Sequence, residues 1–294
     1  MTGNIKIAIA SGKGGTGKTL VSTNLFYLLQ QQGYVVTLVD CDAEEPNAMV
    51  FFDGKVEKTN DIKQKIPVID ASKCTFCGKC HEYCNYNAIF LLPESEIISV
   101  IEDLCHGCGA CSVACNAGAI SEKDVSLGIV TSFRVSEKSK IIEARMKVGV
   151  YSPVSIIKEA NKEAGNHGII IMDSPPGTSC PFIQTVSTAD YVILVTEPTP
   201  FGLSDLKQSV NTLKTMSKSY GVIINRAGLG DKAIYSYLQQ ESIPLLLEIP
   251  FDKTIASAYS RGKIVLEHNP QLLQSFATML TAILEKYGNR HNQR

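Results

Sequence analysis

The stretch Gly12-Lys-Gly-Gly-Thr-Gly-Lys-Thr19 decides the fold class of this chain. It follows the apolar run Ile5–Ala10, which has the length of a buried strand, and it precedes leucines at helical spacing from Leu20 to Leu29. A glycine-rich turn between a strand and a helix presents backbone N–H groups at the helix N-terminus, where they bind phosphate. The stretch therefore predicts a phosphate-binding loop at the edge of an α/β sheet.

Two nucleotide motifs compete for this loop, beside the simpler reading as a glycine-rich turn. Gly12, Gly14 and Gly17 fit a dinucleotide fingerprint, and Asp40 lies where that fold places its ribose-binding acid. Lys18 and Thr19 favour a triphosphate instead, because an ammonium bridges the β- and γ-phosphates and a hydroxyl binds Mg²⁺. The sequence thus predicts ATP and Mg²⁺ as ligands, bound by Gly12, Lys13, Gly14, Gly15, Thr16, Gly17, Lys18 and Thr19.

Further strand-length apolar runs alternate with helix-period stretches along the chain. This rhythm is typical of a mostly parallel sheet covered by helices, so the expected fold class is α/β. The predicted strands are Ile5–Ala10, Val35–Val39, Lys147–Tyr151, Gly168–Met172, Tyr191–Val195, Gly221–Ile224 and Leu245–Ile249.

Polar residues at the ends of these strands are candidates for the rest of the nucleotide site, since ligands bind at the carboxyl edge of such sheets. Asp173, with Gly177 close behind it, is expected to reach Mg²⁺ through water. Asp40 and Asp42 are candidates for the hydration shell of the metal and for orienting the attacking water, respectively. Strand-end aspartates also form simple turns.

The pair Asn225-Arg226 follows another predicted strand. The Asn225 amide is expected to read adenine and Arg226 to lie in the nucleotide site, with a solvated turn as the alternative.

Eight of the ten cysteines fall between Cys74 and Cys115, in two sets that repeat with a period of 31 residues. The residues from Cys74 to Phe90 match those from Cys105 to Ser121 at 8 of 17 positions. Each set has the spacing C-x2-C-x2-C-x3-C of bacterial ferredoxins, in which the fourth cysteine ligates the other cluster. The predicted sets are therefore crossed: Cys74, Cys77, Cys80 and Cys115 on one [4Fe–4S] cluster, and Cys105, Cys108, Cys111 and Cys84 on the other.

Zinc is the alternative metal for these cysteines. It prefers paired C-x2-C hooks, and a third nearby cysteine would crowd a tetrahedral ion. Asn85 and Asn116 stand where a proline usually follows the fourth cysteine. Asparagine restricts the turn less than proline does, and it has a backbone N–H that proline lacks.

The strand–helix rhythm stops where the cysteines begin. We expect a small α+β ferredoxin-like domain at residues 61–125, inserted into an ATPase domain of residues 1–60 and 126–294. After the insert, the runs Ile129–Val135 and Lys140–Met146 predict a hairpin that returns the chain to the sheet.

Outside the insert the chain resembles the deviant Walker A ATPases of the MinD/ParA and nitrogenase iron-protein superfamily. The resemblance lies in Lys13-Gly-Gly-Thr-Gly-Lys-Thr19, Asp40-Cys-Asp42 and Asp173-Ser-Pro-Pro-Gly177. It implies that Lys18 and Asp42 act in ATP hydrolysis and that Lys13 crosses to the phosphates of a partner. That partner is an identical chain, in an ATP-dependent dimer, or a paired homologous subunit.

Together these motifs indicate an ATP-hydrolysing iron–sulfur protein that couples nucleotide state to electron transfer. The alternative is an ATPase for cluster assembly, cluster carriage or the organisation of a complex. Eight cysteines in a closed two-cluster pattern favour clusters that the protein retains.

Charge and hydropathy limit the partners. The chain has 28 basic and 29 acidic side chains, which predicts no nucleic-acid partner. Residues 66–124 carry three basic and eight acidic side chains, so a redox partner is expected to present a basic face. The apolar stripe from Leu272 to Tyr287 has few basic residues beside it, which predicts packing on the sheet and no membrane anchor. We expect a cytoplasmic protein.

Two cysteines remain outside the sets. Cys41 is expected to pack as a small apolar residue at a strand end. Cys180 follows Asp173 by seven residues, the offset at which the resembling nitrogenase iron protein has a cluster ligand. A second ligand per subunit is missing here, because no cysteine lies between Asn116 and Ser179, so a packed thiol is the expectation.

Overall fold

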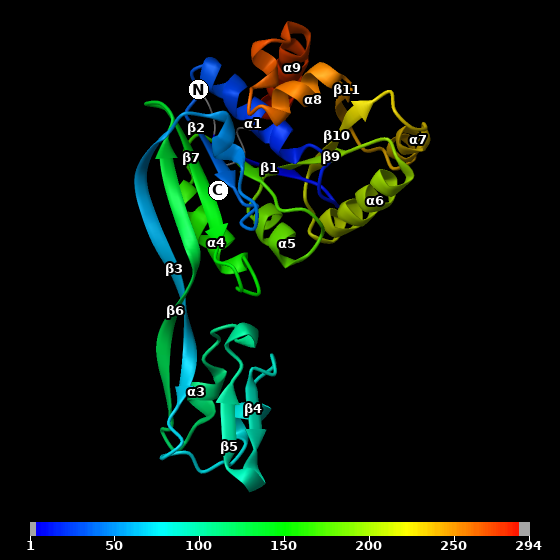
Figure 1. The fold of residues 1–294 in the computed structure, drawn as a ribbon. Helices are drawn as coiled ribbons and strands as arrows, with labels where there is room; N and C mark the ends of the chain where they lie inside the picture. Colours follow the sequence, from blue (N-terminus) through cyan, green and yellow to red (C-terminus); the bar gives the residue numbers. More distant parts are fainter. Residues whose placement is uncertain (1–3, 288–294) are drawn as a thin grey trace. The chain divides into compact units, whose positions relative to one another are not determined.

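A computed structural model describes residues 4–287, in which the chain forms two compact units (Figure 1). The first unit contains the residues up to Asn60, Val130–Arg145, and the chain from Val154 onward. The second contains Asp61–Ile129 and Met146–Pro153. The outermost parts of the predicted ATPase domain, residues 1–3 and 288–294, lie outside the described residues.

One sheet of nine strands runs through the described part of the chain, in the order β11-β10-β9-β1-β8-β2-β7-β6-β3. The strands from β11 to β7 pair in parallel, and the predicted α/β fold class is confirmed. These strands are β1 (Ile5–Ala10), β2 (Val36–Asp40), β7 (Ser139–Met146), β8 (Ile169–Asp173), β9 (Tyr191–Thr196), β10 (Tyr220–Ala227) and β11 (Leu245–Pro250). The long strands β3 (Lys55–Ile69) and β6 (Ile120–Arg134) each continue into the second unit.

The predicted strand at Lys147–Tyr151 is wrong. This segment is a turn in which Gly149 has φ +90°, a conformation that interrupts an extended run. The place in the sheet is taken by β7, which pairs with β2 so that Glu143 lies beside Asp40. The predicted hairpin is confirmed, because the Val135 N–H donates to the Ser139 carbonyl where β6 turns into β7.

Helices cover both faces of the parallel strands (Figure 1). On one face lie α1 (Lys18–Gln31), α8 (Lys253–Ser260) and α9 (Pro270–Tyr287), and on the other lie α4 (Val154–Ala164), α5 (Cys180–Ser187) and α6 (Pro200–Thr215). The helix α7 (Ala233–Gln240) follows β10 and contacts α6.

The largest apolar core of the described residues lies between the sheet and α1, α8 and α9. Phe26 of α1 and Phe276 of α9 are both completely buried in it. The predicted packing of the C-terminal stripe is thus confirmed, since Leu272, Met279, Leu280 and Ile283 belong to the same core. None of the helices in residues 4–287 is long and apolar enough to span a membrane.

The second unit consists of short elements around the cysteines. These are the outer part of β3, α2 (Lys79–Glu82), β4 (Ile89–Leu92), β5 (Ile97–Val100), α3 (Ala110–Ala114) and the first part of β6. The strands β4 and β5 pair antiparallel, with Ile89 opposite Val100. The helices α2 and α3 start after Gly78 and Gly109, 31 residues apart, and both glycines have positive φ. The repeat in the sequence is therefore also a repeat in the backbone.

Candidate functional site

The phosphate loop connects β1 to α1 at the carboxyl edge of the sheet. Gly17 precedes the helix with φ +101°, and a side chain there would collide with the Asn225 amide. A side chain at Gly12 would collide with the backbone of Asp205. Glycine is required at both positions, because neighbouring elements approach the loop backbone closely.

Lys18 begins α1 and is 7% exposed. Burial lowers the pKa of its ammonium, while the nearby carboxylates of Asp173 and Asp42 raise it. The ammonium thus lies at the helix N-terminus near two acids from other strand ends or the loops after them, and a bound phosphate would bring further negative charge there.

Asp173 ends β8 and is 1% exposed, yet neither of its carboxylate oxygens has a hydrogen-bond partner in the described structure. Burial raises the pKa of this carboxyl, and the nearby charge of Lys18 lowers it. A buried carboxyl without a partner is costly unless an ion or water satisfies it. Asp173 and Thr19 therefore fit the ligand type and placement that Mg²⁺ and its water shell need.

Asp40 lies beside Asp173 at the end of β2. One of its carboxylate oxygens accepts from the N–H groups of Asn47 and Ala48, both at 2.9 Å, and the other accepts from Asp42 N–H at 3.2 Å. Burial and the nearby Asp173 raise its pKa, while these hydrogen bonds lower it. In this structure Asp40 holds the backbone of the loop after β2, and its predicted place in the hydration shell of Mg²⁺ stays a prediction.

Asp42 is half-buried within the same loop. Burial raises the pKa of its carboxyl and the charge of Lys18 lowers it. The predicted role of Asp42 in orienting the attacking water stays a prediction.

Lys13 and Arg226 meet at a residue that the sequence interpretation missed. Glu197, directly after β9, pairs through one carboxylate oxygen with Lys13 and through the other with Arg226 at 2.8 Å. Arg226 also lies 3.4 Å from the Gly15 carbonyl. Glu197 follows the carboxyl end of β9, which was predicted correctly. The rule that polar residues at strand ends are candidates for the nucleotide site, which selected Asp173, could therefore have selected Glu197 too.

Asn225 braces the phosphate loop in this structure. Its amide nitrogen donates to the Thr16 carbonyl at 2.8 Å, and its amide oxygen accepts from the Arg226 N–H at 2.9 Å. Both ends of the amide are used inside the protein, so its contacts are those of a positioning residue. They do not show the adenine reading that the sequence predicts.

The cysteines outside the two sets lie in the first unit. Cys41 is buried as expected, 3.6 Å from the Asn161 amide oxygen, and burial raises the pKa of its thiol. Cys180 starts α5 and is exposed, in contrast to the expected packing.

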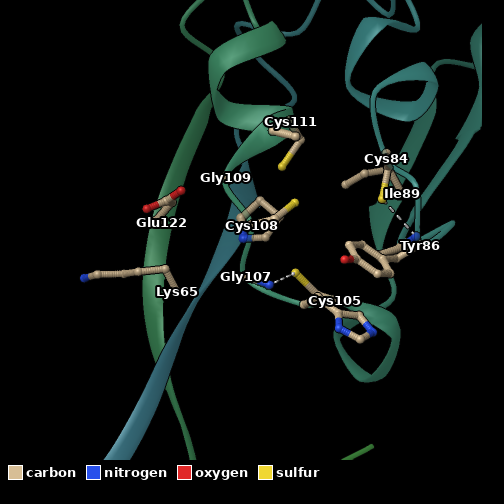
Figure 2. A pocket seen from close by; sticks show the side chains of 14 residues that line it. Lys65, Cys84, Tyr86, Ile89, Cys105, Gly107, Cys108, Gly109, Cys111 and Glu122 are labelled. Atoms are coloured by element: carbon tan, nitrogen blue, oxygen red, sulfur yellow. Dashed lines mark hydrogen bonds between the residues drawn. The ribbon is translucent and has the colours of Figure 1, made fainter. Parts of the chain in front are cut away.

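The eight remaining cysteines line two pockets of the second unit. Pocket A is lined by Cys74, Cys77, Cys80 and Cys115, and pocket B by Cys84, Cys105, Cys108 and Cys111. The structure thus brings together the same crossed sets of four that the spacing predicts. Figure 2 shows the four cysteine side chains of pocket B around a common space.

Backbone N–H groups point at the sulfur atoms of both pockets. In pocket A, Phe76 and Ala119 donate to Cys74 Sγ at 3.4 Å and Cys115 Sγ at 3.3 Å. The equivalent donors in pocket B are Gly107, to Cys105 Sγ at 3.5 Å, and Ala88, to Cys84 Sγ at 3.3 Å. Such donors stabilise thiolate charge, so both pockets fit an iron–sulfur cluster by ligand type and hydrogen bonding.

Burial differs among the thiols in the same way in both pockets. Burial raises the pKa of Cys80 and of Cys111, which lie side by side in the small core of the unit. Cys77 is exposed, and a hydrogen bond from the Lys79 N–H lowers its pKa.

Within residues 4–287, no three His, Cys, Asp or Glu side chains converge so that they could hold a single metal ion.

Comparison with known proteins matches residues 7–266 to the family described as the CobQ/CobB/MinD/ParA nucleotide binding domain. An uncharacterized protein of Methanocaldococcus jannaschii is 32% identical over 90% of this chain and 92% of its own length. An iron–sulfur cluster carrier protein of Aquifex aeolicus is 24% identical over 96% of this chain and 69% of its own.

Among solved structures, the septum site-determining protein MinD of Pyrococcus horikoshii in complex with Mg-ADP has the same fold. The two chains superpose with a TM-score of 0.59 over 95% of each, at 22% identity.

Proposed function

Because the chain belongs to the CobQ/CobB/MinD/ParA nucleotide-binding family, we propose that it is an ATPase that holds two [4Fe–4S] clusters and couples nucleotide state to electron transfer. One observation carries the proposal. Each pocket of the second unit is lined by one complete crossed set of four cysteines, with backbone donors on the sulfur atoms.

On the nucleotide side, Lys18 neutralises the β- and γ-phosphates and the amides of the loop hold the remaining charge. Thr19 and Asp173 receive Mg²⁺ and its water shell. Asp42 orients the water that attacks the γ-phosphate, and Asp40 keeps the loop that carries Asp42 in place through its three backbone hydrogen bonds.

Lys13 acts across a subunit boundary in this proposal, either in a homodimer or with a paired homologous subunit. Its ammonium is paired with Glu197 in the single chain, so it must exchange this carboxylate for the phosphates of the partner. Arg226 remains as a second cation on Glu197 and compensates for the loss.

In the second unit, the eight cysteines hold the clusters, and the clusters supply one-electron storage and transfer when bound. Zinc is disfavoured because each pocket is lined by four cysteines of which three belong to one tight motif. Residues 66–124 have an excess of acidic over basic side chains, so we expect the redox partner to present lysine and arginine.

The order of elements along the chain gives a route for coupling. The loop that carries Asp42 is followed by β3, which continues into the second unit. A change in this loop with phosphate occupancy is therefore transmitted along one strand, and coupling free energies between sites are typically about 1–3 kcal/mol.

Cluster carriage is the second candidate, and the similarity to a protein named as an iron–sulfur cluster carrier favours it. A carrier gives its cluster to an acceptor, whereas an electron carrier keeps its clusters while their redox state changes. The candidates therefore differ in the fate of the iron.

The deciding experiment uses anaerobically purified full-length protein. About eight iron and eight sulfide per chain are expected, and stoichiometric zinc without sulfide would overturn the cluster proposal. The protein is then cycled between dithionite and an oxidant, and separately mixed with an apo-ferredoxin in the presence of ATP. Retained iron with reversible bleaching supports electron transfer, and ATP-dependent loss of iron to the acceptor supports carriage.

A further inference from the structure

The two cysteine pockets have matching ligands but different surroundings. We propose that the aromatic stack of Tyr86, His106 and Tyr151 makes the cluster of pocket B harder to reduce than the cluster of pocket A. This inference rests on the proposed function, because it requires a cluster in each pocket. It adds that the pockets are unequal and that a first electron resides in pocket A.

The burial of the cysteines does not distinguish the pockets. Positions related by the 31-residue repeat have the same exposure: Cys77 and Cys108 are exposed, and Cys80 and Cys111 are buried. The two backbone N–H donors to sulfur are also equivalent, with distances that agree within 0.1 Å. A difference in potential must therefore come from groups outside the repeat pattern.

Pocket B has an aromatic cover. The rings of Tyr86 and His106, both of which line the pocket, are stacked with centroids 3.9 Å apart and an interplanar angle of 15°. Tyr151 meets His106 edge-on, with centroids 6.0 Å apart. Figure 2 shows the Tyr86 ring next to Cys84 and Cys105, at the side of the pocket where these two sulfur atoms lie.

Pocket A has no ring stack. Its lining contains one aromatic residue, Phe76, which makes no ring contact with another aromatic side chain among the described residues. The residues related to Tyr86 and His106 by the repeat are Ala117 and Thr75, and both line pocket A. Tyr151 comes from the segment Met146–Pro153, which lies outside the repeat and joins only one half of it. The stack of three rings thus belongs to pocket B, whereas pocket A has the single ring of Phe76.

The charged residues differ in the same direction. Lys79 lines pocket A without an acidic residue in the lining. Lys65 and Glu122 line pocket B, and Lys65 is paired with Asp124 at 2.8 Å. The residues that line pocket A therefore carry a net positive charge. In pocket B, the charges of Lys65 and Glu122 cancel, and the net charge becomes negative when Asp124, the partner of Lys65, is included.

Both differences oppose reduction in pocket B. Reduction adds one negative charge to a cluster, and aromatic rings stabilise this charge less well than the water that they replace. A nearby ammonium favours the added charge and a nearby carboxylate disfavours it. The higher potential is therefore expected in pocket A.

The test is a potentiometric titration of the reconstituted holoprotein at one fixed pH, followed by EPR. Two one-electron steps are expected in the unchanged protein. Tyr86→Ala should move only the lower step upward, by about tenfold in the reduction equilibrium constant, which corresponds to ~59 mV. Lys79→Gln should move only the upper step downward, and together the two variants assign the steps to the pockets.

Two controls separate the cover from general damage. Tyr83→Ala removes a tyrosine that is 57% exposed and lines neither pocket, and it should leave both steps in place. Tyr86→Leu keeps an apolar cover and should shift the lower step less than Tyr86→Ala does. If Tyr86→Ala loses iron, Tyr151→Ala, which alters a more exposed ring of the stack, takes its place.

The iron content distinguishes the two possible failures. Protein without about eight iron and eight sulfide overturns the proposed function. Protein with the full content, but with one common potential or with identical curves for Tyr86→Ala and Tyr83→Ala, overturns only the inference.

Discussion

The two units of this chain build their sites in opposite ways. The nucleotide site collects single residues from the ends of β1, β2, β8, β9 and β10, which are far apart in the sequence, over a large apolar core. The cysteine pockets use two short motifs, and the core beside them contains Cys80, Ile89 and Cys111. The comparison teaches that the first unit is organised by its sheet, whereas the second packs around its cysteines, which we propose to bind iron–sulfur clusters.

The largest effect is expected from removal of the clusters. Because two of the three buried residues in the apolar cluster beside the pockets, Cys80 and Cys111, are proposed ligands, iron chelation should loosen the packing of the second unit. Hydrogen exchange should then show loss of protection in Asp61–Ile129, while the amides of α1 stay protected. Retained protection in both units would show that the second unit folds without metal.

Lys18→Ala tests the nucleotide site of the first unit. The buried ammonium lies near Asp42 and Asp173, so its loss removes the charge that attracts phosphate and leaves two carboxylates near the site without it. ATP affinity, measured by calorimetry, should fall at least about 100-fold, which corresponds to ~2.7 kcal/mol. Iron and sulfide content should be unchanged. A loss of iron in this variant would contradict the independence of the two sites.

Asp42→Ala separates binding from turnover. The variant should bind ATP with little change and hydrolyse it about 100-fold more slowly, because the attacking water loses its orienting group. Asp40→Asn is the informative comparison, since it weakens the hydrogen bonds that hold the loop and should affect binding and turnover together. Unchanged turnover in Asp42→Ala would remove this residue from the catalytic group.

A smaller effect is expected from pH on the nucleotide-free protein. Burial raises the pKa of Asp173 and of Asp40, so the folded state binds protons more tightly than the unfolded state does. The stability of the first unit should therefore decrease as the pH rises above the usual range of carboxyl groups, by ~1.4 kcal/mol for each pKa unit of the shift. Hydrogen exchange of the α1 amides measures this slope.

The matched variants for this pH dependence are Asp173→Asn and Asp231→Asn. The first removes a buried carboxyl and should flatten the slope, whereas the second removes an exposed one in the same unit and should keep it. Addition of Mg²⁺ and nucleotide should also flatten the slope, because the metal favours the charged form of Asp173. Equal slopes in both variants would assign the pH dependence to other groups.

The smallest effect is expected at Glu197. Glu197→Gln weakens the pair with Lys13 and frees the lysine for a partner, so ATP-dependent dimerisation should become about two- to fivefold tighter in sedimentation experiments. Glu241→Gln, which breaks the exposed pair with Lys214, is the control and should have no effect. Dimerisation that ignores ATP would contradict the proposed role of Lys13.

Much of the fold followed from local patterns. Six of the seven predicted parallel strands lie where the apolar runs predict them, because a strand buried on both faces needs a short continuous apolar stretch. Lys147–Tyr151 failed for a local reason too, since Gly149 turns the chain. The crossed cysteine sets were readable because motif spacing places three thiols around one pocket and directs the fourth to the other.

The sequence by itself therefore determined the α/β class, the phosphate loop and the grouping of the cysteines, all of which depend on residues close together in the chain. The tertiary structure alone decided that Asn225 braces the loop, that Asp40 holds the backbone after β2, that Glu197 joins Lys13 to Arg226, and that Tyr151 reaches His106. The physical reason is that these contacts arise from strand order and chain returns. Pairing of distant segments is set by burial of the whole sheet and not by the residues next to each position.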